Sequence, residues 1–92
     1  MNKYDNELIF FIFQYYMAYT KNMFITKDEF LKDTTLQSDY NAVIVMLNGF
    51  TIRNGFNSIE ELLASISPSV LITALCIKHN NDNCYEKTKK YK

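Results

Sequence analysis

Residues that break helices are scarce in this chain of 92 residues, which contains two glycines and one proline. Cysteine and histidine are also scarce, with two and one. Two cysteines cannot form the disulfide framework that stabilises small secreted domains, so we expect reduced thiols in a cytoplasm. With one histidine and no glycine-rich phosphate loop, the sequence specifies neither a nucleophilic relay nor a nucleotide site. We therefore predict no enzymatic activity and no cofactor.

Net charge is absent as well, because ten basic and ten acidic residues cancel. No global field then draws the chain to nucleic acid or acidic lipid, and we expect no direct contact with either. The apolar run Leu8 to Tyr19 would span about 18 Å as a helix, short of the roughly 30 Å hydrocarbon core of a bilayer. The sequence therefore predicts a soluble domain over residues 1–84, followed by a solvated basic tail over residues 85–92.

What the sequence does contain is a series of helix-start signals, and they predict an all-α fold of about five short helices. Asp5 or Asn6 can cap a first helix that runs to about Thr20. Residues 26–29 and 58–61 are capping boxes, in which a hydroxyl and a glutamate satisfy each other's free backbone amides. These boxes open the second and fourth helices, the latter ending near residue 65.

The middle of the chain fits two different structures. Ser38 or Asp39 can cap a third helix over residues 40–48 that stops at Gly49. Its link to the fourth helix contains glycine, which is typical of a helix-turn-helix. Alternatively, the β-branched residues near Val43, and the alternating residues before the turn pair at 54–55, indicate that residues 43–53 belong to a small hairpin.

The last helix begins at Ser67-Pro68, because proline is tolerated at the first helical position. We expect it to end near His79, before the polar run 80–83. His79 is interpreted as a helix-terminal or surface histidine. The possible zinc ligands in this region are Cys76, His79, Asp82 and Cys84. Structural zinc sites usually use paired CxxC or HxxxH ligands, and this region has neither, so no metal is predicted.

The first helix is apolar on every side, with Gln14 as its only polar side chain between Leu8 and Tyr19. On a helical wheel one stripe is expected to dock on the domain itself: Leu8, Ile12, Tyr15 and Tyr19, flanked by Phe11 and Tyr16. Four other short helices are expected to cover only one side of such a helix. The other side is therefore the predicted partner-contact face, made of Ile9, Phe10, Phe13, Tyr16 and Met17. The alternative is a central helix wrapped by the others, as in some compact bundles.

Paired acids do not indicate catalysis here, because both pairs lie in the first turn of a predicted helix, where the dipole favours negative charge. The pair Glu60 and Glu61 also opposes the use of the fourth helix on DNA, where it would face phosphates with only Arg53 nearby. A DNA-binding regulator is thus the first alternative, and a small phage assembly protein the second.

Six segments of the chain carry residue types in the order found in one family of small helical proteins. They are Met1–Lys3 before the apolar first helix, the helix starts Thr26–Leu31 and Ser58–Leu63, the pair Leu47–Asn48, the helix cap Ser67, and the Tyr- and Lys-rich residues 85–92. In these segments the chain resembles the AsiA anti-sigma factors of T4-type phages. The resemblance implies a homodimer formed through the first helix. It also implies that this contact is exchanged for the promoter-recognition region of the primary sigma factor, in a host cytoplasm.

Overall fold

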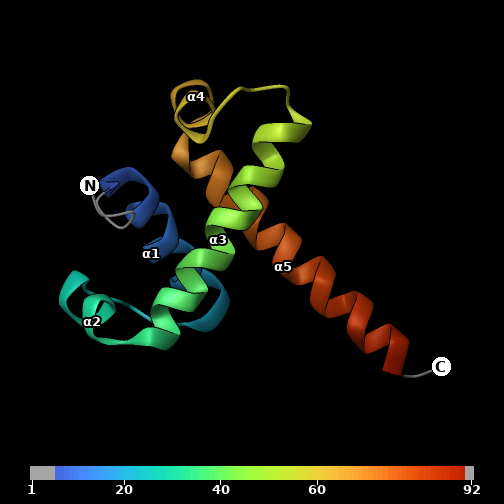
Figure 1. Cartoon of the computed structure of the whole chain (residues 1–92). Coiled ribbons are helices and arrows are strands. Elements are labelled where there is room, and N and C mark those ends of the chain that lie inside the picture. The colour runs from blue at the N-terminus through green and yellow to red at the C-terminus, as the bar shows by residue number, and fades with distance from the viewer. Residues whose placement is uncertain (1–5, 91–92) are drawn as a thin grey trace.

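The computed structural model describes the backbone of residues 6–90 and the side chains of residues 6–81. Within that range the chain forms five helices and no strand, which confirms the all-α class (Figure 1). The helices are α1 (Glu7–Lys21), α2 (Lys27–Lys32), α3 (Thr34–Arg53), α4 (Ile59–Ser65) and α5 (Pro68–Lys90). α1 packs against α5 and α3, while α2 and α4 each pack on α3. The C-terminal part of α5 extends beyond the other helices.

Helices α1, α2 and α4 start as predicted, each at a side-chain cap. The Asn6 side chain accepts a hydrogen bond from the Ile9 amide at 3.0 Å. The hydroxyls of Thr26 and Ser58 accept from the amides three residues later, both at 3.2 Å. Glu61 also accepts from the amide of Asn57, the residue before the cap, at 3.1 Å. These side chains thus satisfy amides that would otherwise lack partners.

Helix α3 is longer than expected at both ends. Its cap is Asp33, whose carboxylate accepts from the amides of Thr35 and Leu36, so the predicted cap at Ser38 or Asp39 is wrong. The predicted stop at Gly49 and the hairpin over 43–53 are also wrong. Helix-spaced residues of α3 are buried along one side: Leu36, Tyr40, Val43, Leu47 and Thr51. This burial outweighs the weak β preference of valine and isoleucine.

The end of α3 uses the turn pair at residues 54–55. Asn54 caps the helix, and Gly55 follows with a φ of 76°, a left-handed conformation that glycine adopts without a steric penalty. The turn signal in the sequence was therefore real. It ends a helix rather than joining two strands.

Helix α5 starts at Pro68 as predicted but continues through residues 80–83 to Lys90. The expected end near His79 is therefore wrong. Asparagine and aspartate cost a helix only about 0.7 kcal/mol each relative to alanine, which is too little to stop one without a glycine or proline. The helix also runs without a break through residue 85, where the basic tail was expected to begin.

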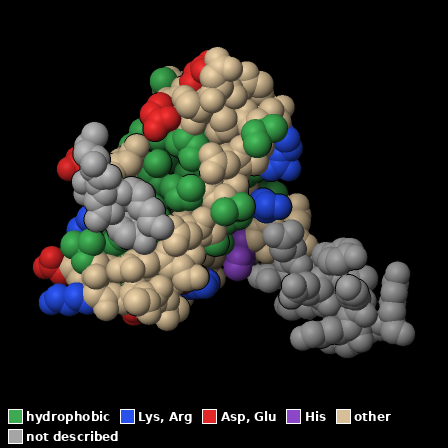
Figure 2. Space-filling model, viewed as in Figure 1, with side chains coloured by type: hydrophobic (Ala, Val, Ile, Leu, Met, Phe, Trp, Pro, Cys, Tyr) green, Lys and Arg blue, Asp and Glu red, His purple; other side chains and the backbone are tan. Residues whose placement is uncertain are grey.

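The core is built around aromatic rings that α1, α2 and α3 contribute together. Phe13 of α1 lies 5.6 Å from Phe30 of α2 and 5.4 Å from Tyr40 of α3, measured between ring centroids. Phe10 extends this aromatic cluster, with its ring 5.2 Å from Phe30. On the α5 side, Leu71, Ile72 and Leu75 are buried. Hydrophobic side chains also gather between α1 and α4 on one face of the molecule (Figure 2).

Replacing Phe13 should unfold the domain far more readily than replacing Phe11 on the same helix. Phe13 is fully buried, and Phe→Ala at such sites costs about 3–5 kcal/mol of unfolding free energy. Phe11 is 42% exposed, so we expect Phe11→Ala to cost less than half as much. Urea denaturation followed by far-UV circular dichroism measures both. Equal costs would contradict the assignment of α1's buried side.

Candidate functional site

The structure corrects the predicted partner-contact face. Its five residues all lie in the core, each no more than 8% exposed: Ile9, Phe10, Phe13, Tyr16 and Met17. The error lies in the assumption that four short helices cover only one side of α1. Because α3 and α5 have 20 and 23 residues, they cover two adjacent sides of it. A partner that meets this fold cannot reach the predicted face.

The accessible apolar side of α1 is the stripe that was expected to dock inward. Leu8, Phe11, Tyr15 and Tyr19 are exposed, whereas Ile12 of the same predicted stripe is buried. The rings of Phe11 and Tyr15 have centroids 4.7 Å apart, and those of Tyr15 and Tyr19 are 6.1 Å apart. The three rings follow one another at a spacing of four residues, so they form an aromatic row along α1.

A groove separates the aromatic row from α5. This α1–α5 groove has a volume of about 570 Å³. Its lining residues are Phe11, Tyr15 and Tyr19 on α1 and Ser69, Ile72, Thr73, Cys76, Ile77 and Asn80 on α5. None of these described lining residues carries a charge at neutral pH. The groove is therefore suited to an uncharged, largely apolar segment.

The loop between α1 and α2 extends this apolar surface. Asn22 ends α1 in the left-handed conformation, with a φ of 55°, and the Gln14 amide donates to the Ile25 carbonyl at 2.8 Å. These contacts fix the loop so that Phe24 is 83% exposed. Phe24 and Tyr15 border a second hollow of about 300 Å³. Tyr15 thus links the hollow to the α1–α5 groove.

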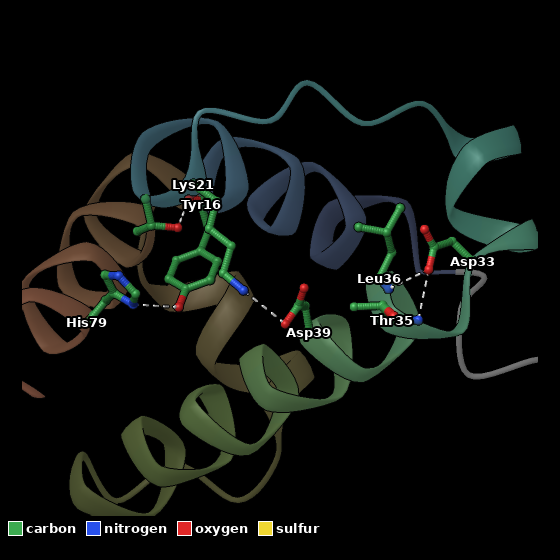
Figure 3. A network of polar contacts seen from close by, with 8 residues as sticks. Tyr16, Lys21, Asp33, Thr35, Leu36, Asp39 and His79 are labelled. Carbon is green, nitrogen blue, oxygen red and sulfur yellow. Dashed lines mark hydrogen bonds and ion pairs between the residues drawn. The ribbon is translucent and has the colours of Figure 1, made fainter. Parts of the chain in front are cut away.

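Polar contacts on the covered side of α1 fix its position against its neighbours (Figure 3). The Tyr16 hydroxyl and Nδ1 of His79 on α5 form a hydrogen bond of 3.4 Å, and the two rings are nearly perpendicular at 89°. Nζ of Lys21 lies 3.2 Å from the Asp39 carboxylate on α3. His79 is therefore a partly buried contact between helices. The Tyr16–His79 contact holds the two walls of the α1–α5 groove together, whereas the Lys21–Asp39 pair joins α1 to α3.

The remaining candidates for chemistry have structural roles or lie outside the described side chains. In the described part of the chain, no group of three or more His, Cys, Asp or Glu side chains is placed to hold a metal ion. Asp82 and Cys84, two of the possible zinc ligands, have side chains outside the described residues. Glu29 and Glu61 belong to the first turns of their helices, as expected.

Among the described helices, none alone is long and apolar enough to cross a bilayer. By length and composition, α4 and residues 68–81 of α5 pass such a test only as a pair, and the pair is bent by 114°.

Cys76 provides a reporter for the α1–α5 groove. Burial raises the pKa of its thiol above the ordinary value of 9.0, because a thiolate is poorly solvated there. The thiolate is the reactive form of cysteine. We therefore expect the alkylation of Cys76 by iodoacetamide to reach half its maximal rate at a higher pH in the folded chain than in the unfolded chain. The rate is measured in a Cys84→Ser background, with the urea-unfolded chain as control. Equal midpoints in the two states would contradict the burial of Cys76.

Comparison of the chain with family models, with curated proteins and with solved structures found no match in any of the three.

Proposed function

We propose that this protein is a non-enzymatic regulator that binds a helical segment of another protein in the α1–α5 groove. The observation that supports this proposal is the aromatic row of Phe11, Tyr15 and Tyr19, which borders an uncharged groove. Amphipathic helices bind in such grooves through apolar side chains spaced three and four residues apart. Tyrosines suit this role because an apolar ring carries a polar tip.

For the partner, we propose the promoter-recognition region of a primary sigma factor, on the basis of the resemblance to AsiA. Two of the segments that carry the resemblance begin α2 and α4, where Thr26 and Ser58 act as helix caps. These segments therefore bear on the fold rather than on the groove. The groove adds a requirement of its own, which is that the partner presents an uncharged apolar helix face.

Self-association of the free chain is the second part of the proposal. In a symmetric dimer each copy would bury the exposed parts of five large side chains, which contributes about 5 kcal/mol per copy and about 10 kcal/mol in total: Leu8, Phe11, Tyr15, Tyr19 and Ile77. Association itself costs roughly 4–15 kcal/mol in lost freedom of motion. Since this gain exceeds the cost only in the lower part of that range, we propose a weak homodimer through this surface, which a better-fitting partner can displace.

Replacing Tyr19 tests the site directly. Tyr19→Glu places a charge at the edge of the groove and should weaken binding to a purified sigma promoter-recognition region at least tenfold, as expected for an interface anchor. Val45→Glu on α3 is the matched control, because Val45 and Tyr19 are both 69% exposed. We expect it to change the affinity less than twofold by isothermal titration calorimetry.

Two results would contradict this part of the proposal. Equal losses in the Tyr19 and Val45 variants would remove the α1–α5 groove as the site. No binding of the unaltered chain to sigma regions from several bacteria would remove the anti-sigma function.

Self-association is tested separately by sedimentation velocity. We expect a monomer–dimer equilibrium with a dissociation constant of about 0.1–1 mM, which corresponds to a net gain of roughly 4–5.5 kcal/mol. Tyr19→Glu should leave only monomer, and Val45→Glu should leave the equilibrium unchanged. A dimer that persists in the Tyr19 variant would show that another surface forms it.

A further inference from the structure

A second groove lies on the next side of α5, where the end of α3 passes over it. This α3–α5 groove has a volume of about 590 Å³. Phe50 of α3 and Ala74 and Ile77 of α5 provide its apolar lining, and Arg53 and Lys78 provide its positive charge. On this side of the molecule, basic side chains lie next to hydrophobic ones (Figure 2).

The guanidinium of Arg53 is held in place at this groove. Its Nε donates to the Gly49 carbonyl at 3.3 Å, and its central carbon lies 5.2 Å from the centroid of the Phe50 ring. A Cβ at Gly49 would lie 3.4 Å from the Arg53 guanidinium, which shows how closely this side chain folds back along α3. A cation that is already ordered loses less entropy when it pairs with a carboxylate.

Among the described residues that line the α3–α5 groove, the charged ones are both basic: Arg53 on α3 and Lys78 on α5. A guanidinium carries five N–H donors, and only Nε is used within α3, toward Gly49. The combination of an apolar lining with two cations complements a segment that carries both apolar and acidic side chains.

We propose that the α3–α5 groove binds an acidic amphipathic segment of a partner protein. The apolar side chains of that segment contact Phe50, Ala74 and Ile77, and its carboxylates pair with Arg53, while Lys78 adds positive charge to the same surface. A nucleic acid would use the cations but leave the apolar lining uncovered. The inference goes beyond the proposed function, because its charged residues do not line the α1–α5 groove and it holds even if that groove binds nothing.

The probe is a fluorescein-labelled helical peptide with leucines along one face and glutamates elsewhere, compared with a peptide of identical leucines and lysines in place of the glutamates. Fluorescence anisotropy at low salt should give at least tenfold tighter binding of the glutamate peptide. The preference should shrink as salt rises, since screening weakens exposed charge pairs. Similar affinities for both peptides would overturn the proposal, as would binding of duplex DNA in preference to the glutamate peptide.

Three variants test whether the peptide binds in the α3–α5 groove. Arg53→Gln should weaken binding of the glutamate peptide about fivefold, in the range of partly exposed charge pairs, and Arg53→Glu should remove the preference for it. Lys32→Glu on α2 is the control, because it changes the net charge by the same amount as Arg53→Glu. It should change the affinity for the glutamate peptide less than twofold. Arg53→Gln keeps the test valid if Arg53→Glu unfolds the chain.

A variant of the other groove separates the two sites. In the absence of any other ligand, Tyr19→Glu should leave the affinity for the glutamate peptide unchanged. This result does not depend on whether the proposed function of the α1–α5 groove is correct. Loss of peptide binding in Tyr19→Glu together with full binding in Arg53→Gln would overturn the inference. An effect of Lys32→Glu as large as that of Arg53→Gln would also overturn it, because attraction would then depend only on net charge.

Discussion

The packing of α1 between α3 and α5 is the constraint on which the remaining structure depends. Phe13 meets Phe30 and Tyr40 on one side, and Tyr16 meets His79 on the next. Once these sides are buried, the geometry of a helix forces the rings of the aromatic row outward, because side chains about 100° apart cannot share one direction. The exposed row and the grooved surface are thus consequences of the way the core is filled.

Local features of the sequence predicted the starts of α1, α2, α4 and α5. A cap such as Thr26 or Ser58 acts within about four residues, so the information needed to recognise it lies in the adjacent sequence. Helix length proved harder to predict. At α3, burial along a whole side of the helix carries it through Gly49, and that burial depends on residues far away in the chain.

The side of α1 that faces the core could not be predicted from the wheel alone, since both sides are apolar. Phe13 and Phe11 look equivalent in the sequence, and only the positions of α2, α3 and α5 distinguish them. The prediction that the apolar excess of α1 lies at Phe10, Phe13 and Met17 is wrong, and the exposed apolar side chains are instead Leu8 and the aromatic row. The α3–α5 groove was not predicted at all, since its walls come from residues at least twenty positions apart.

Ile77 borders both grooves, although it was unremarkable in the sequence. A ligand that shifts this side chain to another rotamer while filling one groove alters the wall of the other. Thermodynamic linkage then requires the effect to be mutual, so each bound segment changes the affinity for the other by the same factor. One aliphatic side chain can in this way make two neighbouring binding events cooperative or competitive.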